Sequence, residues 1–140
     1  MRGLRPLAAL LAFALPVSAC RMDSQDEVLA TSRSQLQLRA VETRAFDTTD
    51  RAAILQAVIS TLQDLGFIVD RADDLIGTVT ATKLSGYALR LTVTLRPVGK
   101  RILVRASGQY NLDAVTDPQP YQQFFAALSK ALFLQANQVD

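Results

Sequence analysis

The chain has 140 residues, 49% of them hydrophobic and 20% charged, with one cysteine and no histidine or tryptophan. Without histidine it lacks the commonest general base and metal ligand, and one cysteine excludes an internal disulfide. The formal charge of +2 belongs to residues 1–19, which hold Arg2, Arg5 and no acid, and the balanced remainder of 13 basic and 13 acidic residues argues against nucleic-acid binding.

Residues 1–19 have the three-part layout of a secretory signal. Two arginines precede an uncharged apolar run at 6–17, which is about a dozen residues long and too short for a helix that spans a bilayer. The sequence VSAC that follows resembles the lipobox of bacterial lipoproteins, a branched apolar residue and two small residues before cysteine. The resemblance implies cleavage between Ala19 and Cys20 and attachment of lipid to the Cys20 thiol. Two or more acyl chains give stable membrane anchoring.

The polar residues that follow the cysteine show no strong periodicity, and we predict a lipidated N-terminus and flexible tether over 20–34. Arg21 stands where an inner-membrane lipoprotein of enterobacteria carries aspartate. Its presence favours anchoring in the outer membrane of the bacterial envelope, with the protein facing the periplasm. The remaining residues, 35–140, are predicted to form a single domain.

The first half of this domain is predicted to contain two strands and a helix. Residues 35–46 alternate apolar and polar side chains, as a strand does. Several N-cap candidates at 47–50 precede a helix with apolar residues at helical spacing, which ends at the C-cap Gly66. A short strand at 67–69 and a polar turn at 70–74 follow.

Strands at 78–83, 87–96 and 101–110 and a final helix at 118–135 complete the prediction. The segment 87–96 is the clearest strand, because leucine and valine alternate with arginine and threonine along it. The order β-α-β-β-β-β-α predicts an α+β fold. We expect a two-layer sandwich in which two helices cover one face of an antiparallel sheet.

Residues 46–83, FDTTDRAAILQAVISTLQDLGFIVDRADDLIGTVTATK, resemble a module of bacterial envelope lipoproteins. The shared features are a strand-ending aromatic residue, a helix with an aliphatic residue at every turn, Gly-Phe, a strand, an acidic turn and a strand that begins after glycine. The domains of the lipoprotein BamC have a similar pattern. The resemblance implies a helix-grip fold and a non-catalytic accessory role in an outer-membrane assembly machine.

The strand alternation also predicts a surface for a partner. The outer face of the sheet is expected to carry threonines and a group of arginines with one leucine among them: Arg90, Arg96, Arg101, Leu103 and Arg105. This face either binds an anion or a partner protein or is an ordinary solvated sheet face. Phe133 lies off the apolar stripe of the final helix and either docks a partner or caps the core.

The remaining acidic and aromatic residues are predicted to have structural roles rather than roles in binding or catalysis. Asp70, Asp73 and Asp74 lack the spacing of a calcium loop and are predicted to form a solvated turn. The aromatic residues Tyr121, Phe124 and Phe125 are expected in the core. No phosphate-binding glycine loop and no nucleophile elbow occur in the sequence. We therefore expect no enzyme activity, no metal and no cofactor.

The leading hypothesis from the sequence is a lipid-anchored interaction module of an envelope complex, bound to the membrane by lipid and to a protein partner by its domain. The alternative is a lipid-anchored carrier that binds a small apolar ligand between helix and sheet. An envelope hydrolase, which would need clustered carboxylates in a cleft, is a third hypothesis.

Overall fold

The computed structural model describes residues 22–85 and 87–137. The predicted signal sequence and Cys20 lie outside these residues. The described chain falls into two units, which divide between Arg33 and Ser34. None of its helices is long and apolar enough to cross a membrane.

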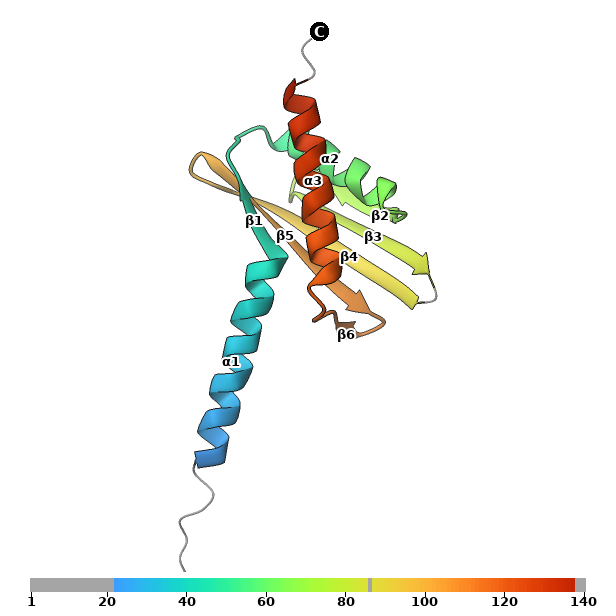
Figure 1. The fold of residues 1–140 in the computed structure, drawn as a ribbon. Helices are drawn as coiled ribbons and strands as arrows, with labels where there is room; N and C mark the ends of the chain where they lie inside the picture. Colours follow the sequence, from blue (N-terminus) through green and yellow to red (C-terminus); the bar gives the residue numbers. More distant parts are fainter. Residues whose placement is uncertain (1–21, 86, 138–140) are drawn as a thin grey trace, which may run out of the picture. The chain divides into compact units, whose positions relative to one another are not determined.

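Six strands of the described residues form one antiparallel sheet in the order β1-β5-β4-β3-β2, with β6 paired to β5 (Figure 1). The strands are β1 (Thr43–Phe46), β2 (Ile68–Asp73), β3 (Thr78–Ser85), β4 (Tyr87–Val98), β5 (Arg101–Tyr110) and β6 (Asp113–Ala114). Consecutive strands from β2 to β6 are joined by hairpins, which makes each of these four pairs antiparallel.

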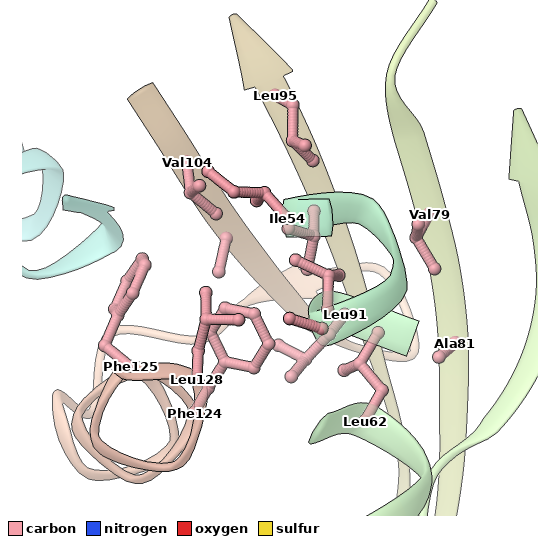
Figure 2. Packing of buried hydrophobic residues seen from close by; sticks show 14 of the residues in the cluster. Ile54, Leu62, Val79, Ala81, Leu91, Leu95, Val104, Phe124, Phe125 and Leu128 are labelled. Carbon is pink, nitrogen blue, oxygen red and sulfur yellow. The ribbon is translucent and has the colours of Figure 1, made fainter. Parts of the chain in front are cut away.

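Helices α2 (Arg51–Asp64) and α3 (Gln119–Asn137) cover one face of this sheet (Figure 1). Figure 2 shows their side chains gathered over the strands, with Ile54, Phe124 and Leu128 close to Leu91. These four side chains are at most 1% exposed, and burying each contributes about 1.5–3 kcal/mol. The predicted α+β class is confirmed, and the aromatic residues Tyr121, Phe124 and Phe125 lie in the core, as expected.

The ends of α2 follow local rules that the sequence carries. Asp50 caps the N-terminus, where its carboxylate accepts a hydrogen bond from Ala53 N at 3.0 Å. At the C-terminus, Gly66 has φ +84°, and Phe67 N donates to Leu62 O at 2.9 Å. This is a Schellman motif, for which the positive φ favours glycine.

Residues 22–42 differ from the prediction, because they form helix α1 (Met22–Glu42). The expected strand from residue 35 is wrong, since β1 begins only at Thr43, and the described part of the predicted tether, residues 22–34, is helical. The segment is rich in leucine, glutamine, arginine and alanine, which are strong helix formers. In the alternating stretch, Leu36 is 64% exposed, so the period of two does not reflect a buried sheet face.

The second half of the sheet also departs from the predicted boundaries. Strand β2 continues to Asp73, so Asp70 and Asp73 belong to a strand rather than to a turn. A register shift between Val69 and Arg71 accommodates them at this edge strand. The two-residue strand β6 was not predicted, and it follows a turn in which Asn111 has φ +55°.

Candidate functional site

The outer face of the sheet, opposite α2 and α3, is polar. The structure places the predicted arginines and Leu103 there, because their inward neighbours Val93, Leu95, Ile102 and Val104 are at most 4% exposed. Strand pairing sets their order across the face. Thr43 and Thr94 both pair with Arg105, and Arg96 pairs with Leu103.

A cleft of about 450 Å³ opens on this face. We call it the arginine cleft, and its lining residues are Arg39, Thr43, Thr94, Arg96, Leu103 and Arg105. Arg39 comes from the last turn of α1, Arg96 from β4 and Arg105 from β5. The sequence did not point to Arg39, because residues 35–46 were predicted to be a strand. The spacing of Leu38 and Val41, which both pack against the core, is a helical signal that could have placed it.

One arginine of the cleft has an acidic partner. Arg105 Nη2 lies 3.1 Å from Glu42 Oε2, and the Glu42 side chain is only 7% exposed. Arg39 and Arg96 form no ion pair with any residue that the structure describes. The cleft therefore carries two uncompensated positive charges beside one fixed by a buried carboxylate.

Arg101, Arg90 and Phe133 lie outside the cleft. Arg101 pairs with Asp47 at 2.7 Å, and both side chains are exposed. Arg90 lies nearer the start of β4, opposite Gln109 and Thr82. Phe133 of α3 is 67% exposed, so it does not cap the core, and it lines a separate cleft of about 730 Å³ with Phe46 and the start of α2.

The acidic residues at 70–74 make local contacts rather than a cation site. Asp70 Oδ2 accepts a hydrogen bond from Thr82 Oγ1 at 2.6 Å, and Asp73 pairs with Arg71 at 3.3 Å. The hydrogen bond from Ile76 N lowers the pKa of the Asp73 carboxyl, and Arg71 acts in the same direction. Within the described ranges, no three acidic or cysteine side chains come together as metal ligands.

A polar contact that the sequence did not reveal lies in the core, between α3 and β5. The Tyr121 hydroxyl donates to Val115 O at 2.6 Å and accepts from Gly108 N at 3.1 Å. Burial raises the pKa of this hydroxyl above its ordinary value of 10.0, and the negative charge of Glu42 adds to the shift. The contact ties the loop before α3 to β5.

A further cleft, of about 310 Å³, lies between helix and sheet at the end where α2 stops and α3 begins. Leu65, Phe67 and Leu89 supply its apolar wall, and Lys83 and Asp117 supply charges. The Lys83 ammonium lies 5.7 Å from the centre of the Phe67 ring. The cleft is thus amphipathic rather than purely apolar.

Comparisons with known proteins do not assign the chain to a family. No protein-family model matches it, and no curated protein is significantly similar to it in sequence. The surfaces described above are therefore what indicates a function.

Proposed function

We propose that this protein is a lipid-anchored, non-catalytic interaction module of the bacterial envelope, and that it docks a partner protein on the outer face of its sheet. The observation that carries the proposal is the arginine cleft, which brings Arg39, Arg96 and Arg105 together from three elements on the face that α2 and α3 leave uncovered. The lipobox-like sequence at Cys20 supports the anchoring.

Site-specific crosslinking in cells tests the docking. A photoreactive amino acid replaces Thr92, which lies at the centre of the outer face between Thr80 and Ser107. The matched control carries the same group at Gln122, an exposed position on α3. We expect one defined protein adduct from position 92 and none from position 122. Equal adducts from both positions, or none from either at native expression, would contradict the proposal.

Replacement of the lipidated residue tests the anchoring. Cys20→Ala removes the thiol that would carry the lipid, so we expect the protein to move from the membrane fraction to the soluble fraction. Incorporation of labelled palmitate should be lost in the same variant. Labelled palmitate that persists in the Cys20→Ala variant would show that Cys20 does not carry the lipid.

The alternative function, a carrier for a small ligand, would use the cleft between helix and sheet. Its position between α2, α3 and the strands favours this reading, although Lys83 and Asp117 call for an amphipathic ligand. Titration with a fluorescent fatty acid tests it, with Leu89→Gln as the variant that makes the wall polar. If the wild-type chain shows no saturable binding, the carrier function is excluded.

A further inference from the structure

The arginine cleft has neighbours that indicate what it binds. Across the sheet, Thr43, Arg105, Thr94, Thr78 and Asp73 form one cross-strand row, which runs from β1 to β2. Adjacent strands lie about 4.8 Å apart, so the row is roughly 19 Å long. It is positive at the β1 end, bears hydroxyl groups in the middle and ends at an acid.

The acidic side chains at one end of this row already have partners, whereas two arginines at the other end have none in the described part of the chain. At the acidic end, Asp73 already pairs with Arg71, and Asp70 accepts a hydrogen bond from Thr82. At the basic end, Arg39 and Arg96 have no acidic partner among the described residues. The unsatisfied charge of the outer face is therefore positive and is concentrated in the arginine cleft.

We propose that the arginine cleft binds carboxylates of an acidic, extended segment of the partner protein. The inference rests on the proposed function and adds the chemistry of the partner. Arg39 and Arg96 would make charge-assisted hydrogen bonds to the carboxylates, and guanidinium suits that geometry because it can donate two parallel bonds. Thr43 and Thr94 add hydroxyl donors, and Leu103 gives the segment an apolar contact.

The same observations disfavour other anions. A cleft of about 450 Å³ with its arginines on three elements is broad for a single phosphate, which is usually held by convergent backbone N–H groups. Surfaces that bind anionic lipid commonly carry four to eight basic residues, whereas the cleft holds three, of which Arg105 is paired with Glu42. An extended acidic segment can instead place separate carboxylates against arginines that lie on different elements of the cleft.

Glu42 is the positioning residue of this site. Its buried carboxylate holds the Arg105 guanidinium at the junction of α1 and β1. Arg39 lies in the last turn of the same helix. The contact between Glu42 and Arg105 therefore also fixes the position of Arg39 beside the cleft. The site is therefore assembled from an element that the sequence alone predicted to be a flexible tether followed by a strand.

Binding of a model peptide to the full chain in a nonionic detergent tests the proposal. The probe is fluorescein-labelled decaglutamate, measured by fluorescence anisotropy at low salt, with decaglutamine as the neutral peptide. We expect saturable binding of decaglutamate only. Arg96→Gln and Arg39→Gln should each weaken it about fivefold, as expected for loss of one exposed ion pair, and 0.5 M salt should weaken it further.

Arg90→Gln is the matched control, because it removes the same charge from the same strand and face outside the cleft. It should change the affinity less than twofold, and urea unfolding checks that all three variants are folded. Equal weakening by Arg90→Gln, or displacement of the peptide by millimolar inorganic phosphate or by phosphatidylglycerol added to the detergent micelles, would overturn the assignment. If decaglutamate does not bind while position 92 still crosslinks to a partner, the acidic segment is excluded and the docking function remains.

Discussion

The Tyr121 hydroxyl satisfies two buried backbone groups at once. It donates to Val115 O and accepts from Gly108 N, and the residue is 0% exposed. A buried polar group that loses its partner costs about 1–3 kcal/mol. Gly108 allows the close approach, because a Cβ at this position would lie 3.1 Å from the Tyr121 oxygen.

Tyr121→Phe should lower the free energy of unfolding at pH 7 by about 1–3 kcal/mol, because Val115 O and Gly108 N lose their partner. The pKa of Tyr121 is raised in the folded state, so the contribution is complete below pH 10 and declines as the pH rises above it. Urea unfolding at pH 7 and pH 11 measures both effects. The gap between wild type and variant should narrow at pH 11.

Tyr110→Phe is the comparison for this substitution, because it deletes the same atom from a residue that is 38% exposed rather than buried. If Tyr121→Phe and wild type are equally stable at pH 7, the hydroxyl contributes nothing to the fold. A gap of constant size between pH 7 and pH 11 would contradict the raised pKa.

Single residues of the arginine cleft differ in how far the sequence could place them. Arg96, Leu103 and Arg105 follow from strand alternation, because a period of two assigns each to the outer face. Arg39 and Glu42 do not follow from it, because both belong to a helix whose apolar residues happen to alternate. Their meeting with Arg105 depends on the pairing of Thr43 with Arg105, a long-range contact that no local pattern encodes.

At the scale of elements, the turn between β2 and β3 is fixed by a side chain from α2. Arg51 donates hydrogen bonds from Nη2 to the carbonyl oxygens of Asp74 and Leu75. Gly77, with φ +67°, lies against this guanidinium, and its carbonyl accepts from Leu95 N at 2.8 Å. The turn therefore joins the start of α2 to the sheet.

Gly77→Ala should destabilise the protein more than Gly99→Ala does. Both glycines have positive φ, so each substitution incurs the left-handed penalty of about 1–2 kcal/mol. A Cβ at Gly77 would also lie 2.8 Å from Arg51 Nη2 and 3.1 Å from Leu95 O, whereas a Cβ at Gly99 meets nothing within 4 Å. We expect a further loss of about 1–3 kcal/mol at Gly77, measured by urea unfolding. If the two variants lose the same unfolding free energy, the Arg51 side chain moves aside at no measurable cost.

Elements with strong local signals were predicted well, and weak or conflicting signals account for the errors. Strand β4 alternates cleanly, and α2 carries its N-cap and its C-cap glycine in the sequence. The predicted strand at 67–69 ended too early, because the aspartates that follow it are typical of a turn. The observed strand β2 continues to Asp73, since an edge strand tolerates charges on its exposed side. Strand β6 has two residues and depends on its pairing with β5, which is a tertiary contact.

The whole molecule combines a well-packed unit, residues 34–140, with an N-terminal part of α1 whose apolar side chains are exposed. In residues 34–140, side chains from α2, α3 and the sheet form one buried cluster. In the described part of the other unit, Val28 and Leu29 of α1 are 65% and 54% exposed. Helices without a packed face are marginally stable in water, so opening of this segment should cost far less than unfolding of the domain.

Proline substitutions test this difference. Ala30→Pro removes a backbone hydrogen bond within the exposed part of α1, and we expect it to change the unfolding free energy of residues 34–140 by less than about 0.5 kcal/mol. Ala57→Pro is the matched control in α2, where the alanine is 1% exposed, and it should cost about 3 kcal/mol or more. Circular dichroism should show lost helix in both variants, while urea unfolding separates them. A marked loss of stability in Ala30→Pro would mean that the first turns of α1 help to hold the domain, and the arginine cleft would then depend on the whole helix rather than on its last turn.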